Sequence, residues 1–210
     1  MVRVDKNEKI IVGVSGGADS SALIHILTSL NYNCIIAHCN FHLRGEESVR
    51  DENFVTLLAK QYNCPFYKID FQTKEYADEN RISIEMAARD LRYLWFESLR
   101  QKENASYIAV AHHADDIVET VLMNLTRGTG IYGLCGIKPQ NGYIIRPLLS
   151  VWRSEIMDYI EENKLSFVFD STNNDTEFVR NKFRKKIIPL LEEINPSFSK
   201  NLIETTEKLS

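Results

Sequence analysis

The chain has 210 residues, of which 44% are hydrophobic and 26% charged, proportions typical of one sizeable globular domain. The formal net charge of −4 excludes a generally basic nucleic-acid binder, and no apolar run is long enough to span a bilayer. The chain has four scattered cysteines, Cys34, Cys39, Cys64 and Cys135. Their spacing excludes a C-x-x-C motif and favours a reducing compartment, so we expect a cytoplasmic protein.

The most informative segment joins a buried strand, predicted over residues 10–14, to a helix that begins near residue 18. Its loop lacks the lysine of a Walker motif, and its glycines do not fit the Rossmann spacing. Glycines let the backbone approach a phosphate, and the first helical turn offers unpaired N–H groups. The loop residues predicted to bind a nucleotide phosphate are Ser15, Gly16, Gly17, Ala18, Asp19 and Ser20. A plain strand-to-helix turn is the alternative.

Asp19 has two interpretations at this position. It is either the N-cap of the helix, which would fix the turn, or a ligand of Mg²⁺ that carries the nucleotide phosphates.

Further along the chain, strands alternate with helices. Strands are predicted over 34–38, 66–71 and 107–111, and apolar residues recur at helical spacing after each of them, ending with a helix over 115–125. Beyond Arg146 the alternation stops, and the patterns are helical over 152–163, 177–191 and after Pro196. This order predicts an α/β fold, a doubly wound and mainly parallel five-stranded sheet with a C-terminal helical extension.

Polar residues follow three of the predicted strands. In parallel sheets, ligands bind where the strands end, so the 15–20 loop, His38 and Asn40, and the 112–116 segment are expected to converge. The loop after His38 also carries His42 and Arg44, for which a solvated loop is an equally good interpretation.

The segment from His112 to Thr120 is the second candidate for chemistry. Asp116 and Glu119 are three residues apart, and Asp115 and Glu119 four, so either pair shares one face of a helix. Paired carboxylates at the end of a strand suit Mg²⁺ binding or proton abstraction. An ordinary acidic helix N-terminus is the alternative, which we favour for Asp115 alone.

Two later segments carry arginines. Arg127 precedes a glycine-rich loop over 128–133 that suits a substrate cover, although a plain connector is equally compatible. Arg180 and Arg184 lie one helical turn apart, after the polar segment 170–173, and suit a phosphate contact. A solvated basic helix face is the usual meaning of such a charge run.

Several of these blocks, taken in order, resemble one family. They cover residues 15–20, 38–44, 85–93, 111–120, 127–134, 146–149, 170–173 and 180–184. Together they are similar to the N-terminal catalytic domain of the tRNA(Ile)-lysidine synthases, within the PP-loop ATP-pyrophosphatase superfamily, whose fold is adenine nucleotide alpha hydrolase-like. The chain departs from the pattern at Phe41, where the family usually has a second histidine.

The resemblance implies that ATP, with Mg²⁺, adenylates the C2 oxygen of the wobble cytidine of a tRNA(Ile) with a CAU anticodon. Free L-lysine then attacks C2 and expels AMP. It further implies that the 15–20 loop and His38 bind ATP and that Asp19 binds Mg²⁺. Asp116 and Glu119 would hold the lysine amine, Arg180 or Arg184 would face the α-phosphate, and His112, Asp115 and Arg127 would contact substrate.

The same resemblance predicts the domain organisation. We expect residues 1–146 to form the PP-loop ATP-binding catalytic domain and 147–210 its helical extension, with C-terminal tRNA-binding domains missing from this chain and a homodimer in solution. Three alternatives share the ATP loop: a tRNA thiolation enzyme, the synthetase half of a glutamine-dependent amidotransferase, and a non-catalytic ATP-binding module. A thiolase would need suitable cysteines, an amidotransferase would need an ammonia-delivering partner, and an inert module would leave the Asp116 and Glu119 block unexplained.

Overall fold

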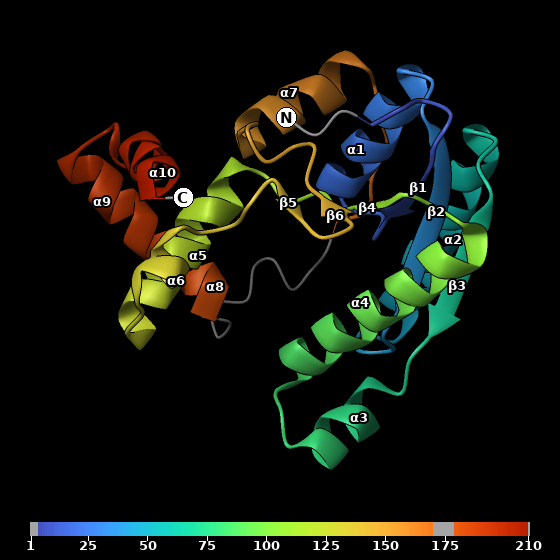
Figure 1. Cartoon of the computed structure of the whole chain (residues 1–210), viewed down its shortest axis with the longest axis horizontal. Coiled ribbons are helices and arrows are strands. Elements are labelled where there is room, and N and C mark those ends of the chain that lie inside the picture. Colours follow the sequence, from blue (N-terminus) through green and yellow to red (C-terminus); the bar gives the residue numbers. More distant parts are fainter. Residues whose placement is uncertain (1–3, 170–178, 210) are drawn as a thin grey trace.

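The computed structural model describes residues 4–169 and 179–209, which form an α/β fold with a central sheet between helices. The strand order is β3-β2-β1-β4-β6-β5 (Figure 1). All neighbouring strands are parallel except β5, which is antiparallel to β6 at one edge. The predicted α/β class and mainly parallel sheet are confirmed, but the described residues form six strands rather than five.

The central strands consist largely of β-branched residues. Ile11 of β1 is in register with Ile35 of β2 on one side and with Ile108 of β4 on the other, and all three are buried. Continuous apolar runs of this kind are typical of parallel strands covered on both faces. The strands are β1 (Lys9–Gly13), β2 (Asn33–Asn40), β3 (Phe66–Asp70), β4 (Tyr107–Ala109), β5 (Gln140–Asn141) and β6 (Ile144–Ile145).

The four strand ranges located from the sequence correspond to β1 to β4, whereas β5 and β6 were not located. Each has two residues, and they form a tight hairpin around Gly142, whose φ is +56°. A run of two residues has no measurable alternation, so hydrophobic periodicity does not detect it. The helix α3 (Thr73–Asn80) was not predicted either, because it has only eight residues and most of them are polar.

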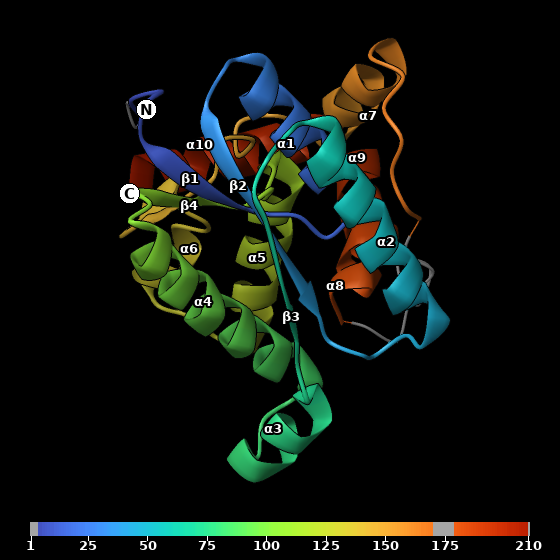
Figure 2. The same ribbon diagram turned by 90° about the vertical axis from the view of Figure 1, so that its right-hand side faces the viewer.

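Helices cover both faces of the sheet (Figure 2). Helices α1 (Ala18–Ser29), α2 (Glu46–Gln61) and α7 (Arg153–Glu162) bury their apolar residues in one core, and α4 (Ile84–Glu103) packs on the opposite face. Phe96 is a large side chain that α4 buries there. Leu57, on the outer face of α2, is 63% exposed.

A helical lobe lies beside the sheet, on the side of the edge strands β5 and β6 (Figure 1). Helix α10 (Phe198–Leu209) packs on α5 (Ala114–Arg127), with Leu202 and Ile203 against Ile117 and Val121. Leu125 is 50% exposed near the end of α5. The other elements are α6 (Ile131–Leu134), α8 (Val179–Lys182), a π-helical turn η2 (Phe183–Ile187) and α9 (Ile188–Ile194).

No helix in residues 4–169 and 179–209 combines the length and apolar character that crossing a membrane requires.

Candidate active site

The loop after β1 turns at Gly16 and enters α1. Gly16 has φ +93°, and a Cβ there would lie 2.6 Å from Cγ2 of Val168, so only glycine fits. The Val168 N–H donates to the Gly16 carbonyl at 2.9 Å, which ties this turn to the chain after α7. Gly17, not Asp19, is the N-cap of α1, and no side chain caps the helix. The first-turn N–H groups therefore remain available to an anion.

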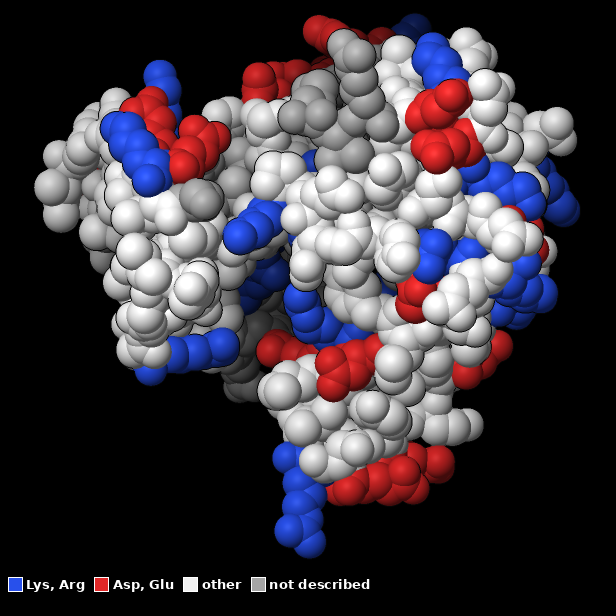
Figure 3. Space-filling view, in the orientation of Figure 1, with Lys and Arg blue, Asp and Glu red and all other residues white. Residues whose placement is uncertain are grey.

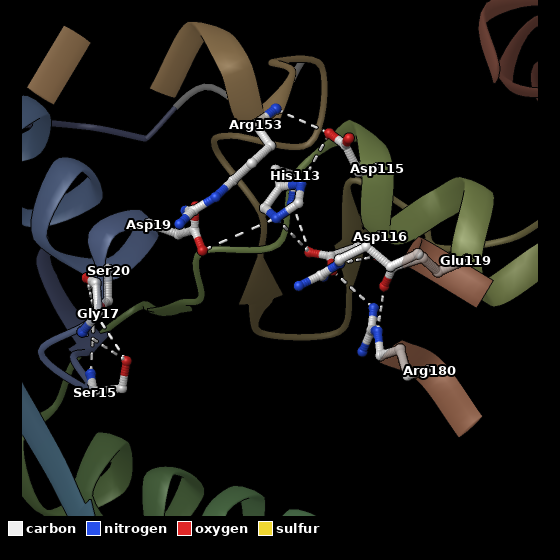
Figure 4. Close-up of polar contacts among 11 residues, drawn as sticks. Ser15, Gly17, Asp19, Ser20, His113, Asp115, Asp116, Glu119, Arg153 and Arg180 are labelled. Atoms are coloured by element: carbon white, nitrogen blue, oxygen red, sulfur yellow. Dashed lines mark hydrogen bonds and ion pairs between the residues drawn. The ribbon is translucent and has the colours of Figure 1, made fainter. Parts of the chain in front are cut away.

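Serine hydroxyls shape this loop (Figure 4). The Ser20 hydroxyl accepts from the Ser15 N–H at 3.2 Å and donates to the Gly17 carbonyl at 3.0 Å. The Gly17 N–H donates to the Ser15 hydroxyl at 3.3 Å. Because these bonds are local, the loop holds its curvature without a ligand.

A cavity of about 270 Å³ opens beside the loop, at the carboxyl ends of the central strands. Loop residues, β2 and α4 line it together with His112, which follows β4. The structure thus brings Ser15, Gly17, Asp19, Ser20 and His112 to one cavity. From α4 it adds Arg92 and Tyr93, to which the sequence analysis gave no role. The signal for them was their place in the 85–93 block of the family pattern.

His38 and Asn40 are not among the residues that line this cavity. The alternation of β2 turns Ala37 and Cys39 toward the cavity, and the His38 Nδ1 hydrogen-bonds the Val14 carbonyl at 2.8 Å. Burial lowers the pKa of His38, so its ring is neutral at physiological pH. The Asn40 amide donates to Glu52 of α2 at 3.1 Å. His38 therefore supports the chain just before the loop and Asn40 contacts α2, and neither side chain converges on the cavity.

Phe41 occupies the position where the family pattern has histidine. Its ring stacks on Phe71 with centroids 5.5 Å apart, and the Arg92 guanidinium lies 5.3 Å from its centroid. The neighbouring His42 ring pairs instead with Asp70 at 2.8 Å, on the protein surface. Phe41 thus positions Arg92, a residue of the cavity wall.

Asp19 forms an ion pair with Arg153 at the start of α7 (Figure 4). One oxygen of Asp19 also lies 4.0 Å from Nε2 of the buried His113, and one oxygen of Asp116 lies 3.7 Å from the same atom. His113 therefore lies between the carboxylate of Asp19, in the 15–20 loop, and that of Asp116, on α5. Arg153 lies 134 residues from Asp19 in the sequence, so sequence reasoning had no local signal for this pairing.

Asp116 and Glu119 form a buried pair on the inner face of α5. Glu119 is 0% exposed, and its two oxygens accept from Arg180 Nε and Arg184 Nε, each at 2.5 Å. Arg180 also donates to Asp116 at 2.8 Å. The predicted candidates thus meet in one cluster, in which two carboxylates face two guanidiniums. The attraction to Glu119 outweighs burial and raises the pKa of Arg184.

Asp115 faces away from this cluster. Its carboxylate accepts from the Arg153 N–H at 2.9 Å and lies 3.3 Å from His113 Nδ1. Burial alone would raise the pKa of Asp115, but these hydrogen bonds outweigh it and lower the pKa. The carboxylate that caps the N-terminus of α5 is that of Asp116, which accepts a hydrogen bond from the His113 N–H at 2.9 Å. Asp115 therefore joins α5 to α7, whereas Asp116 faces the arginines.

His112 is half-buried at the cavity wall. Burial lowers its pKa to about 4, because the effect of Asp116 in the opposite direction is weaker, so the ring is neutral at physiological pH.

Two predicted elements of the site lie elsewhere. Arg127 is exposed at the end of α5 and does not line the cavity beside the loop. Residues 170–173 lie outside the described residues.

The 15–20 loop, with its free backbone N–H donors, lies on one side of the candidate site, and the buried Asp116 and Glu119 pair lies on the other. The loop suits a polyphosphate, and the pair suits a cationic amine or a proton to be removed. Such a site can join an activated phosphate to a nucleophile.

The fold and the loop define the class of protein. A model of the PP-loop domain family matches residues 1–191, so the chain belongs to the PP-loop family, whose nucleotide is ATP.

Within this family, the predicted resemblance is confirmed. The chain is 55% identical over 204 residues to the tRNA(Ile)-lysidine synthase of Bacteroides thetaiotaomicron, covering 97% of the chain and 48% of that protein. It is 52% identical over 207 residues to the tRNA(Ile)-lysidine synthase of Parabacteroides distasonis, covering 99% and 47%. The chain thus spans about half the length of the curated relatives that it matches.

Solved structures show the same fold at low identity. The U34-tRNA thiolase NcsA from Methanococcus maripaludis superposes with a TM-score of 0.79 at 18% identity, over 98% of this chain and 73% of the thiolase. The NH3-dependent NAD synthetase from Campylobacter jejuni superposes with a TM-score of 0.55 at 17% identity, over 96% of this chain and 83% of the synthetase. At these identities the likeness concerns the fold alone.

Proposed function

We propose that this chain is the catalytic part of a tRNA(Ile)-lysidine synthase, which joins free L-lysine to the wobble cytidine of a tRNA(Ile) with a CAU anticodon. The observation that carries the proposal is the buried Asp116 and Glu119 pair, which faces the PP-loop across His113. A site that only binds ATP has no use for two buried carboxylates beside the nucleotide, since burying charge costs free energy. The similarity to curated lysidine synthases supports the choice of substrates.

In the first step, the C2 oxygen of the cytidine attacks the α-phosphorus of ATP, and the bond to pyrophosphate breaks. The N-terminus of α1 and the curved 15–17 backbone would hold the leaving pyrophosphate. Arg180 and Arg184 have side chains that are 40% exposed, so they can turn toward the α-phosphate while remaining near Glu119. A guanidinium there would stabilise the charge that develops in the transition state.

Mg²⁺ fits this site through Asp19. The Asp19 carboxylate lines the cavity beside the loop, and Mg²⁺ commonly binds one or two carboxylates together with phosphate oxygens and water. When bound, the ion would neutralise charge on the phosphates. Arg153 now pairs with Asp19, so the guanidinium has to move aside for Asp19 to bind an ion.

In the second step, the ε-amine of lysine attacks C2, the bond to AMP breaks, and the amine loses a proton. Asp116 and Glu119 would accept hydrogen bonds from the incoming ammonium and take up its proton. In the structure both carboxylates are paired with arginines, so the ammonium has to replace a guanidinium. Movement of Arg180 or Arg184 toward the adenylate would free a carboxylate, which would couple lysine binding to the first step.

The test is incorporation of radiolabelled lysine into a tRNA(Ile) transcript with a CAU anticodon, with ATP and Mg²⁺, alongside pyrophosphate release. We expect incorporation that requires every component. Pyrophosphate release without incorporation would show that another nucleophile is used, and ATP binding without either signal would support a non-catalytic module.

The cysteines give little support to the alternative of tRNA thiolation. Burial raises the pKa of Cys34 and of Cys39 to about 12, so both thiols stay protonated and weakly nucleophilic at neutral pH. Thiolation would require sulfur transfer to the same transcript, and we expect none.

Other parts of the proposal rest on the similarity to lysidine synthases. We place the ATP-binding catalytic domain in residues 1–146 and its helical extension in 147–210. The enzyme would act in the cytoplasm as a homodimer, and C-terminal tRNA-binding domains would complete the protein. Sedimentation of the chain, alone and with tRNA, tests the dimer and the need for those domains.

A further inference from the structure

The cavity beside the 15–20 loop offers few cationic side chains to a phosphate. Among the described residues that line it, Arg92 is the one Lys or Arg. Arg89, Lys138 and Arg146 line a separate cavity of about 420 Å³, and Figure 3 shows Lys and Arg side chains gathered in a hollow between α4 and the lobe that carries α5 and α6. At the loop itself, phosphate binding therefore depends mainly on backbone N–H groups, so the direction of each N–H matters.

The peptide group between Gly16 and Gly17 carries one of these donors, the Gly17 N–H. Both residues lack a Cβ, and Gly16 has φ +93°, so the pair does not by itself fix the plane of this peptide. In a planar trans peptide the carbonyl and the N–H point in opposite directions. Contacts that hold the Gly16 carbonyl therefore also set the direction of the Gly17 N–H.

Two donors from outside the turn hold the Gly16 carbonyl. The Val168 N–H donates to it at 2.9 Å, and the buried Ser21 hydroxyl donates to it at 3.3 Å. At the opposite end of the peptide group, the Gly17 N–H donates to the Ser15 hydroxyl at 3.3 Å, and both of these residues line the cavity. Because that bond is longer than an ordinary N–H to oxygen hydrogen bond, a phosphate oxygen can replace the hydroxyl.

Val168 belongs to a segment, residues 165–169, that we call the strap. The strap begins where α7 ends. Lys164 there has φ +51°, and the Leu165 N–H donates to the Ile160 carbonyl at 2.9 Å. These are the features of a Schellman motif, which fixes the direction in which the chain leaves the helix.

The rest of the strap is held by α2 and by the core. Phe167 packs against the core that α1, α2 and α7 share, and the Arg50 guanidinium on α2 donates to the Phe169 carbonyl at 3.0 Å. The Val168 side chain lies against the Cα of Gly16, where a Cβ would come within 2.6 Å of its Cγ2. The strap is therefore anchored on both sides of the residue that contacts the loop.

We propose that Val168 is a positioning residue of the phosphate site, which acts through the Gly16 carbonyl to hold the Gly17 N–H toward the nucleotide. Ser21 supports the same carbonyl from α1. The inference rests on the proposed function, because the ligand is the pyrophosphate portion of ATP. Val168 itself touches no phosphate, so its effect is confined to ligands that use the Gly17 N–H.

The first measurement uses Val168→Pro, which removes the donor N–H. We expect the Kd for inorganic pyrophosphate and for ATP to rise about five- to tenfold, as for the loss of one hydrogen bond. The Kd for AMP, which lacks the β- and γ-phosphates, should change less than about twofold. Calorimetric titration measures all three values without turnover. In the full reaction the KM for ATP should rise by the same factor, with the KM for lysine unchanged.

Two variants of the strap are matched controls. Ser166→Pro places a proline at an exposed position whose N–H donates no backbone hydrogen bond within the described part of the chain. Val168→Ile keeps both the donor N–H and the branched Cβ. Both variants should bind pyrophosphate within about twofold of the unchanged chain.

Ser21→Ala tests the same carbonyl from the other side and does not depend on how the strap tolerates proline. It removes the second, longer hydrogen bond to Gly16, so the Kd for pyrophosphate should rise about threefold, with that for AMP unchanged. Thermal unfolding of each variant shows that the chain is folded.

An unchanged Kd for pyrophosphate in both Val168→Pro and Ser21→Ala would overturn the proposal, whether or not the chain makes lysidine. Equal weakening of pyrophosphate and AMP would also overturn it, in favour of a general structural contact. Selective loss of pyrophosphate binding, in a chain that incorporates no lysine, would uphold the positioning role and contradict the proposed reaction.

Discussion

The PP-loop and the α5 cluster serve one site but are built in opposite ways. The loop is contiguous, because Ser15, Gly17 and Ser20 hydrogen-bond one another over a separation of at most five residues. Its backbone N–H groups are the donors available to an anion. The α5 cluster joins Glu119 to Arg180 and Arg184, which lie 61 and 65 residues further along the chain. It acts through side-chain charges instead of backbone groups.

The two regions are therefore sensitive to different kinds of substitution. The loop depends on backbone geometry, so a change of glycine should disturb it most. The cluster depends on charge balance, so a loss of one charge leaves others unpaired in a buried setting. Substitutions in either region should therefore give distinguishable effects on ATP binding and on lysine incorporation.

Asp116→Asn should separate the two regions most clearly. We expect lysine incorporation to fall about 10²- to 10⁴-fold, because the amide neither attracts the ammonium nor takes its proton. ATP binding should change less than about twofold, since Asp116 makes no contact with the loop; filter binding of ATP checks this. Full activity in this variant would contradict the role of the carboxylate.

Gly16→Ala should produce the opposite pattern. The added Cβ meets Val168 Cγ2 at 2.6 Å and is strained at φ +93°, so the loop must shift. We expect ATP binding to weaken about 100-fold and the free energy of unfolding to fall by about 1–3 kcal/mol. Gly130→Ala, in an exposed segment where the Cβ meets nothing within 4 Å, is the control and should bind ATP normally.

Both the loop and the carboxylate pair could be predicted in part from the sequence. The Ser-Gly-Gly turn, the strand before it and α1 were predictable, because hydrophobic periodicity and glycine placement are local signals. The Asp116 and Glu119 pairing followed from helical spacing. The direction of the His38 ring was not predictable, because it depends on which face of β2 each residue occupies in the assembled sheet.

His112 lines the cavity beside the loop, and its lowered pKa predicts that the stability of the fold depends on pH. Its pKa is lowered to about 4 in the folded chain, against 6.5 when unfolded. Between these values the unfolded chain binds a proton that the folded chain does not, so stability falls as the pH falls from 6.5 toward 4. The loss amounts to at most about 3 kcal/mol.

Urea unfolding of the chain and of His112→Asn between pH 4.5 and 7.5 measures this contribution. The variant should show a shallower dependence than the unchanged chain. Parallel curves would show that the His112 ring does not titrate in this way.

Arg153→Gln should have the smallest effect. It removes the ion pair that holds Asp19, so the apparent affinity for Mg²⁺ in the presence of ATP should rise about two- to fivefold, as expected for losing one partly exposed pair. Titration of activity with Mg²⁺ measures the shift. Weaker Mg²⁺ dependence would indicate that Arg153 itself contacts the phosphates.

The sequence by itself determined the α/β fold, the position of the phosphate loop and the acidic face of α5, because each is encoded in residues close together in the chain. Only the tertiary structure decided the partners. It paired Arg180 and Arg184 with Glu119, turned Arg153 onto Asp19, and gathered Arg89, Lys138 and Arg146 around one cavity. Those contacts join distant segments, and their energies depend on burial and charge, which exist only once the chain has folded.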